Sequence, residues 1–347
     1  MLKNINLLVT CVGGSTAETL LREIKKSHNY NYNLVGVDAN LESHYDNSIE
    51  TTYVVPSGNA EGYIESMLTI CEKEEIDFIL PGSDEEALAL SKNRSLFDNI
   101  DVHVLVSGEK CLSVITDKLA TYQRLEKAGI RVPEYKVVNN GYELTKALYE
   151  YGYPECTMIS KPTVGRGGRG LYVFKGKGYT PNWLGKGKRE KIVPIEKFND
   201  QIANEAIFGK TLVMPILDAP AYDADVVAKS GSVEVVVVRE RKNPAGIPFT
   251  GNIVSMNGPI IDYCSSITSA LELNSLHDID LMTDTNGNTC IIEVNPRPSG
   301  SVAAALVAGI PIIDIAIKSV IGDELVPIKH KKNNIEIFEK DGCMYIE

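Results

Sequence analysis

Short apolar runs alternate with amphipathic stretches over the first third of the chain. The strand-like runs are residues 5–11, 34–38, 52–55, 78–80 and 102–106. The stretches with helical spacing are residues 17–26, 63–74 and 85–91. Strands that alternate with helices form a parallel sheet covered on both faces. The pattern therefore predicts a Rossmann-like α/β domain at residues 1–107.

The rest of the chain mixes strands and helices less regularly. The predicted strands are residues 135–138, 158–162, 171–174, 212–217, 222–228, 233–239, 335–338 and 344–346. The predicted helices are residues 142–151, 265–273 and 301–308, and one that Thr116 or Asp117 caps. The two strands joined at 229–231 are expected to be antiparallel. We divide this α+β region into parts at residues 108–205 and 206–347.

Residues 277–281 and 291–297 form the most informative pair of predicted strands. The sequence Asn286-Gly287 lies between them. Asn-Gly is the strongest short signal for a β-hairpin and favours a two-residue type I′ turn. The two segments are therefore predicted to pair across this turn.

Counting outward from this turn sets Asp280 opposite Glu293 and Asp278 opposite Asn295. Directly opposed Cβ atoms are about 4.5–5.5 Å apart, so these oxygens crowd one patch. Carboxylates so placed repel each other unless a hard cation lies between them, and Mg²⁺ prefers such oxygen ligands and substrate phosphates. The register predicts a magnesium–nucleotide site; the alternative is a solvated acidic hairpin.

A glycine-rich loop lies between two predicted strands. Lys161 closes the first of them, and the loop at 165–170 has four glycines in six residues, with Arg166 and Arg169 among them. Glycine lets backbone N–H groups approach a polyphosphate closely. Residues 161–191 contain nine Lys or Arg and one acidic residue, which favours an anionic ligand. For residues 176–191 we favour a mobile linker.

Two further features adjoin predicted helix starts. Lys118 lies in the first turn of its helix, the unfavourable end for a cation, so it either faces a phosphate or is a surface charge. Residues 81–85 follow a strand end, where open α/β sheets bind ligands. There Asp84 either contacts a substrate or caps the helix.

Composition restricts the class of protein. The 347-residue chain has a net charge of −11, which argues against a general nucleic-acid binder. Its seven cysteines are scattered, which is typical of reduced thiols in the cytoplasm. The longest apolar stretch, at 301–313, is shorter than the roughly 20 residues of a membrane span. We therefore expect a cytoplasmic protein with no membrane or nucleic-acid partner.

A dinucleotide-binding unit is an alternative use of the first domain. The order strand, Gly13-Gly14 turn, helix, strand and Asp38 follows its outline. A nicotinamide-dependent oxidoreductase built on these residues would leave the glycine-rich loop and the acidic hairpin unexplained.

Taken in order, these parts resemble the ATP-grasp superfamily, in particular the carbamoyl-phosphate-synthase-like branch of carboxylate–amine ligases. The resemblance covers nearly the whole chain. Its elements are the first α/β domain, residues 117–119, Lys161-Pro162 with the glycine-rich loop, residues 223–226, Arg239, Asp280 and residues 293–297. It implies a pre-ATP-grasp domain followed by a two-subdomain ATP-grasp fold.

The resemblance also implies cofactors and roles. ATP is expected between the two subdomains, with Mg²⁺ (or Mn²⁺) on Asp280, Glu293 and Asn295. Lys118 and Lys161 match nucleotide contacts, and Gly165, Gly167 and Gly168 cover the phosphates. Arg297 and Arg239 are candidates for holding the transferring phosphoryl group or an acyl phosphate. The substrates implied are a small carboxylate and an amine, and a homodimer is possible.

The adenine and ribose contacts depart from the family pattern. The hinge, which often carries an acidic residue followed by an aromatic one, is Met214-Pro215-Ile216 here. Backbone groups of Met214 and Ile216 are expected to bind adenine instead. Ala221 replaces a ribose-binding glutamate, so Asp218 or Asp223 is expected to substitute. Phosphorylation without amide formation and a regulator without catalysis remain alternatives.

Overall fold

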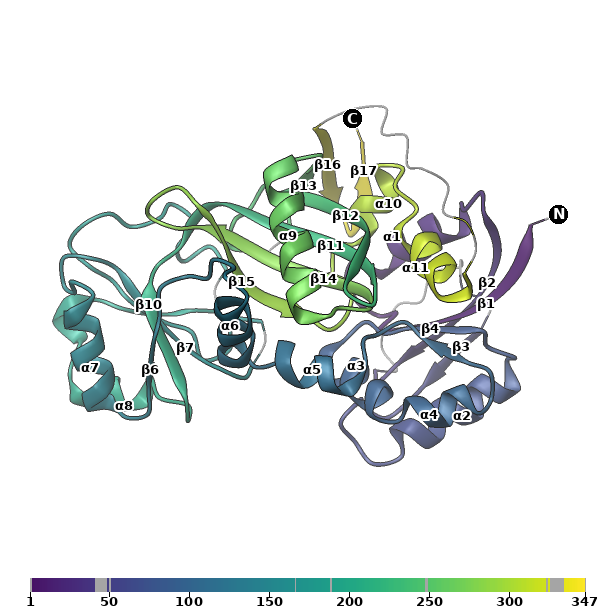
Figure 1. The fold of residues 1–347 in the computed structure, drawn as a ribbon, viewed down its shortest axis with the longest axis horizontal. Coiled ribbons are helices and arrows are strands. Elements are labelled where there is room, and N and C mark those ends of the chain that lie inside the picture. The colour runs from purple at the N-terminus through teal and green to yellow at the C-terminus, as the bar shows by residue number, and fades with distance from the viewer. Residues whose placement is uncertain are drawn as a thin grey trace.

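The computed structural model describes residues 2–40, 49, 51–165, 167–187, 189–246, 249–322, 324 and 334–346. The described chain forms three sheets, which lie side by side along the long axis of the molecule (Figure 1). The third sheet is central, with the second at one end and the first at the other. The predicted Arg166 charge lies outside the described residues.

The first sheet is parallel, with the strand order β3-β2-β1-β4-β5. Its strands are β1 (Lys3–Thr10), β2 (Tyr30–Asp38), β3 (Thr51–Val54), β4 (Phe78–Leu80) and β5 (His103–Val104). Its helices are α1 (Ala17–Lys25), α2 (Tyr63–Lys73), α3 (Asp84–Lys92) and α4 (Arg94–Asp98). The predicted parallel-sheet domain is confirmed.

The second sheet has the order β6-β10-β7-β8-β9. Its strands are β6 (Lys136–Val138), β7 (Met158–Pro162), β8 (Tyr172–Phe174), β9 (Lys191–Val193) and β10 (Thr211–Pro215). The helices that accompany it are α7 (Gly141–Glu150), the 3₁₀ turn η1 (Ile195–Lys197) and α8 (Asp200–Glu205). Strand β10 belongs to this sheet although it follows the predicted boundary at residue 205.

The third sheet is antiparallel, with the order β15-β14-β11-β12-β13-β16-β17. Its strands are β11 (Asp218–Lys229), β12 (Ser232–Arg241), β13 (Gly251–Ser255), β14 (Ser275–Thr283), β15 (Thr289–Asn295), β16 (Ile335–Lys340) and β17 (Cys343–Tyr345). The nearby helices are α5 (Glu109–Ile115), α6 (Lys118–Lys127), α9 (Gly258–Leu271), α10 (Ala303–Val307) and α11 (Ile312–Ile321). The predicted C-terminal hairpin is confirmed.

The two faces of the third sheet have different coverings, because side chains alternate along each strand. On one face, Ala224, Val226 and Ile279 are buried in a core shared with α5, α6 and α9. On the other face, Val227 and Leu276 are buried in a core shared with α10, α11 and the first sheet. Further along this second face the side chains become polar. The functional residues lie on this polar part.

Several elements carried too little sequence signal to be predicted. Strand β9 has three residues, and β13 contains Gly251 and Asn252. Helix α11 follows Pro311 and is apolar almost all round, so it lacks helical periodicity. Helix α9 begins at Gly258, well before the predicted residue 265. No helix in the described part of the chain is long and apolar enough to cross a membrane.

Candidate functional site

A grid of charged and amide side chains occupies the polar part of the third sheet. We call these residues the acidic grid; they are Asp223 and Asp225 on β11, Arg239 and Arg241 on β12, Asp278 and Asp280 on β14, and Glu293 and Asn295 on β15. Asp280 pairs with Asp223 on one side and Glu293 on the other. Asp278 pairs with Asp225 and Asn295 in the next row. The pairing thus brings together all three predicted metal ligands.

The predicted cross-strand pairs are confirmed, but the predicted turn is wrong. Thr283 pairs with Thr289, so the loop is longer than Asn286-Gly287, and the Asp284 carboxylate accepts hydrogen bonds from the backbone of Asn286 and Asn288 at 2.8 Å. This shifts the register by one residue. An irregularity between Asp280 and Leu281 shifts it back. The two offsets cancel before the acidic grid begins.

Arg239, a predicted catalytic residue, is fully buried. Its guanidinium donates to Asp225, Asp223, Asn252, Ser299 and Ser301. The closest carboxylate contact is 2.7 Å, from Nε to Asp225 Oδ2. A buried guanidinium that donates to five side chains holds those neighbours in place. The geometry therefore assigns Arg239 to positioning the loop at 299–301.

Arg241 occupies the position facing the cavity that was expected for Arg239. Its Nε donates to Asp223 Oδ1 at 2.8 Å, and its Nη2 donates to Asp280 Oδ1 at 2.7 Å. Sequence reasoning noted the charged segment 239–242 but did not select Arg241. Side chains two residues apart on a strand share a face, so the sequence places Arg241 on the same face as Arg239.

The pKa values of the grid carboxylates are shifted in opposite directions. Burial raises the pKa of Asp223, but Arg241 and Arg239 outweigh it and lower the pKa to about 2. Burial and the neighbouring carboxylates Asp223 and Glu293 raise the pKa of Asp280 to about 7, although Arg241 opposes them. Burial, together with Asp280 and Asp223, raises the pKa of Asp278 well above its usual range.

This donor set fits a divalent cation. One oxygen each from Asp223, Asp278 and Asp280 lie within 4.8 Å of one another. Asp278 Oδ1 is buried and has no hydrogen-bond partner within the described chain. Its other oxygen accepts from the Asn295 amide at 3.0 Å. Carboxylate and amide oxygens are the ligands that Mg²⁺ uses. A cation would also neutralise the negative charge of the clustered carboxylates.

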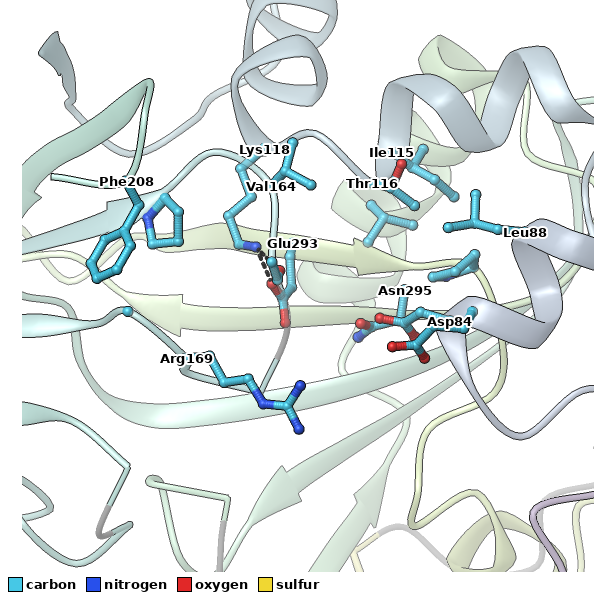
Figure 2. A pocket seen from close by; sticks show the side chains of 16 residues that line it. Asp84, Leu88, Ile115, Thr116, Lys118, Val164, Arg169, Phe208, Glu293 and Asn295 are labelled. Atoms are coloured by element: carbon cyan, nitrogen blue, oxygen red, sulfur yellow. Dashed lines mark hydrogen bonds and ion pairs between the residues drawn. The ribbon is translucent and has the colours of Figure 1, made fainter. Parts of the chain in front are cut away.

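Lys118 connects the acidic grid to the glycine-rich loop. Its Nζ lies 2.9 Å from Glu293 Oε2 and donates to Gly165 O at 2.6 Å (Figure 2). Asp117 caps α6 through Leu119 N, as predicted, and this fixes Lys118 in the first helical turn. Burial raises the pKa of Glu293, but Lys118 outweighs it and the net shift is downward.

Lys161 lies beside Lys118 in a more enclosed position. Its Nζ donates to the Tyr122 hydroxyl at 3.2 Å, and that hydroxyl donates to Ile292 O at 2.8 Å. Burial and the charge of Lys118 lower the pKa of Lys161 to about 7, with Glu293 opposing them. Burying the Lys161 ammonium costs free energy. An anionic ligand bound beside it would offset that cost.

The glycine-rich loop separates two cavities. Gly165, Gly167 and Gly168 all have positive φ, at 147°, 61° and 71°, which other residues rarely adopt. Gly165 lines a cavity of about 460 Å³, which also contains Lys118 and Arg169. Gly167 and Gly168 line a second cavity of about 770 Å³. We call these the side cavity and the main cavity.

The side cavity reaches the acidic grid from the direction of α3. Figure 2 shows Leu88, Ile115 and Thr116 on one side of it, Phe208 on the other, and Glu293 and Asn295 at its floor. Arg169 extends into it and has no partner among the described residues. The main cavity contains Asp280, Glu293 and Asn295 as well. Glu293 and Asn295 therefore line both cavities, and Asp280 lines the main cavity.

Arg297 links the grid to the first domain. Its Nε lies 3.0 Å from Asp84 Oδ1, and its Nη1 lies 3.9 Å from Asp278 Oδ2. Of the two alternatives given for Asp84, helix capping is excluded, because α3 is capped by Ser83, whose hydroxyl accepts from Glu86 N. Arg297 and the missed residues Ser299 and Ser301 line the main cavity.

The predicted hinge lies at an apolar end of the site. Met214 is buried in a cluster with Leu217, Ala221 and Met282. Ile216 N donates to Thr157 O at 3.3 Å. Asp218 accepts from the Tyr179 hydroxyl, while Asp223 is held by the two arginines. Of the two predicted ribose contacts, only Asp218 therefore lies near the hinge.

Asp38, the acidic residue of the dinucleotide-binding alternative, is occupied by hydrogen bonds within its own loop. Asp38 Oδ2 accepts from Gly13 N at 2.9 Å, and Oδ1 accepts from Asn40 N at 2.9 Å. The carboxylate thus holds its own loop. Gly13 and Asp38 line neither cavity.

The three sheets and the grid beneath a glycine-rich loop define an ATP-grasp fold. Residues 208–342 match the family model "ATP-grasp in the biosynthetic pathway with Ter operon", and residues 7–105 match the PylC-like N-terminal domain. The arginine-specific carbamoyl phosphate synthase large chain of Geobacillus stearothermophilus is 25% identical over 280 residues, which is 78% of this chain and 24% of that protein. The chain therefore spans about a quarter of these relatives.

Solved structures show the same fold. N5-carboxyaminoimidazole synthetase from Staphylococcus aureus, complexed with ADP, gives a TM-score of 0.68 at 15% identity, covering 97% of this chain and 83% of that one. The biotin carboxylase domain of 2-oxoglutarate carboxylase from Hydrogenobacter thermophilus, with MgADP, ADP and bicarbonate, gives 0.65 at 17% identity, covering 96% and 73%. The resemblance predicted from the sequence is confirmed: the chain combines a PylC-like N-terminal domain with an ATP-grasp domain and is homologous to carbamoyl phosphate synthase large chains.

Proposed function

We propose that this chain is an ATP- and Mg²⁺-dependent ligase that joins a small carboxylic acid to an amine and releases ADP and phosphate. The observation that carries the proposal is the meeting of two cavities at Glu293 and Asn295. A protein that only binds a nucleotide requires one of these spaces. A ligase requires room for a nucleotide and for further substrates around one reacting centre.

The main cavity is the proposed nucleotide site. Its apolar end contains Trp183 and Ile292, and its charged end contains Arg241 and Arg297. We place the nucleobase at the apolar end and the phosphates below Gly167 and Gly168, as the family resemblance implies. The MgADP and ADP complexes of the structural relatives support the class of ligand.

In the proposed reaction a substrate carboxylate oxygen attacks the γ-phosphorus, and the bond to the ADP oxygen breaks. The amine nitrogen then attacks the acyl carbon, phosphate leaves, and the nitrogen loses a proton. Asp280, Glu293 and Asn295 would hold a divalent cation, which would supply charge neutralisation at the phosphates. Lys118 and Lys161 neutralise phosphate charge from the opposite side, and Arg297 orients the acyl phosphate. Mn²⁺ in place of Mg²⁺, a homodimer and the cytoplasmic location remain predictions.

The test is to incubate the protein with Mg-ATP and pooled carboxylates and amines, and to follow ADP, AMP and phosphate. Substrate-dependent release of ADP with phosphate is the expected result. Hydroxylamine in place of the amine should trap the acyl phosphate as a hydroxamate. AMP as the product would contradict the proposed chemistry. ADP release that never depends on an amine would favour phosphorylation without amide formation.

A further inference from the structure

Trp183 lies at the apolar end of the main cavity and has no role in the reaction described above. It is the only tryptophan in the chain. Its ring packs against the cluster around Met214 and Met282, beside Ile159 and Ile292. Trp183 and Ile292 also line the main cavity. An aromatic ring thus stands where the cavity leaves the charged grid and becomes apolar.

The indole N–H of Trp183 is enclosed and unsatisfied. Its Nε1 is buried and has no hydrogen-bond partner among the described residues. A buried indole N–H normally has a partner, because leaving it unpaired costs free energy. A ligand acceptor would remove that cost once the ring turns its N–H towards the cavity. The flat apolar walls and a single donor suit a nucleobase.

The segment at 176–191, predicted as a mobile linker, is tied down at several points within its described residues, 176–187 and 189–191. Tyr179 O accepts from the Thr157 hydroxyl at 3.3 Å, and the Tyr179 hydroxyl donates to Asp218. Arg189 Nη1 donates to Gly167 O at 3.0 Å. The segment therefore contacts the residue before β7, the first residue of β11 and the glycine-rich loop at once. We call it the strap.

We infer that the strap is a second cover of the nucleotide and that Trp183 stacks on the nucleobase, with Nε1–H donating to an acceptor on the base or ribose. This inference rests on the proposed function and specifies its nucleotide end. The glycine-rich loop covers the phosphates, and the strap covers the base. The hydrogen bond from Arg189 to Gly167 joins the two covers, so closure over one end favours closure over the other.

The single tryptophan makes the contact measurable. MgADP is titrated into the full chain while tryptophan fluorescence and heat are recorded in parallel. The expected result is a saturable fluorescence change with the same Kd as calorimetry. Calorimetric binding with unchanged fluorescence would overturn the inference and leave the nucleotide site standing. No calorimetric binding of MgADP to the unmodified protein would overturn both.

Variants separate stacking from general damage. Trp183→Ala should raise the Kd for MgADP about 10-fold, since base–aromatic stacking is worth about 1–3 kcal/mol per base. Trp183→Phe keeps a ring and loses only the donor, so it should raise the Kd about threefold. Magnesium tripolyphosphate has no base, and its affinity should stay unchanged in both variants. An equal loss for tripolyphosphate would overturn the inference. Tyr142→Ala, at an exposed ring on α7, is the control and should bind MgADP normally.

Discussion

The buried half of the acidic grid, around Arg239, and the cavity half, around Glu293, contain similar charges but neutralise them differently. Arg239 is fully buried and its partners include three uncharged side chains, Asn252, Ser299 and Ser301. Glu293 lies at the junction of two cavities, and Lys118 is its ion-pair partner. The Arg239 guanidinium lines neither cavity, although several of its partners do. Glu293 lies open to both cavities, where a bound cation would join Lys118 as a second positive partner. Burial, more than residue type, separates positioning residues from binding residues here.

The largest expected effect is the loss of stability when the buried half is broken. Arg239→Met should lower the free energy of unfolding by about 3–5 kcal/mol, because it leaves the Asp225 carboxylate buried and uncompensated. Urea unfolding measures the change. Arg241→Met should cost less than half as much, since its partners face a cavity.

The matched control removes both members of the buried pair. Asp225→Leu combined with Arg239→Met should recover part of the lost stability, because an apolar pair leaves no unpaired charge. If the double variant is as unstable as the sum of the two single variants, the ion pair is not the source of the effect.

Turnover should be most sensitive in the cavity half. Glu293→Gln should reduce substrate-dependent ADP release about 100-fold or more, because the amide lacks the negative charge that balances the cation. Some loss of stability is expected as well, because Lys118 loses its ion-pair partner, so turnover is measured at a temperature where urea unfolding shows the variant folded. Glu336→Gln, an exposed carboxylate on β16, should leave turnover unchanged. Normal activity in the Glu293 variant would overturn the metal assignment.

The fold class and two cross-strand pairs could be predicted from the sequence. Apolar alternation and the order of parts were sufficient for the fold class. The pairs Asp280–Glu293 and Asp278–Asn295 were predicted from the Asn286-Gly287 signal, although the turn itself differs. Those pairings were right because a longer loop and a compensating irregularity on the paired strands cancel. A correct local register therefore does not prove a correct turn.

The sequence does not show which side chains of a polar strand face are buried and which face a cavity. Arg239 and Arg241 lie two residues apart on the same face, so periodicity alone cannot choose between them. The choice depends on Ser299 and Ser301, which come from a loop about sixty residues later in the chain. Trp183 was missed for the same reason, since its segment has no regular structure and its partners belong to other strands. The proposed domain boundaries likewise omitted the pairing of β10 with β6 and β7.

A smaller, pH-dependent effect on the free energy of unfolding is expected from Lys161, at the cavity half. Its pKa is lowered to about 7 from an ordinary value of 10.5, so between these pH values the unfolded chain binds more protons. Its contribution should therefore raise stability as pH increases from 7 to 10, and below pH 7 the cost of burying the charge is complete. Lys161→Met should be more stable than the unmodified protein at pH 7, with the difference shrinking towards pH 10. A constant difference across this range would contradict the lowered pKa.

The smallest expected effect tests whether Arg241 competes with a cation for Asp280. Its guanidinium donates to the Asp280 carboxylate at 2.7 Å, at the edge of the candidate metal site. Arg241→Met should therefore bind Mn²⁺, used as a paramagnetic probe without nucleotide, about threefold more tightly. Lys242→Met removes the same charge one residue away, where the partner is Glu336 at the surface, and should leave the affinity unchanged. An equal gain in both variants would indicate a general charge effect. A loss of affinity in Arg241→Met alone would mean that Arg241 holds Asp223 and Asp280 in the geometry that the cation requires, which would place Arg241 with the positioning residues of the buried half.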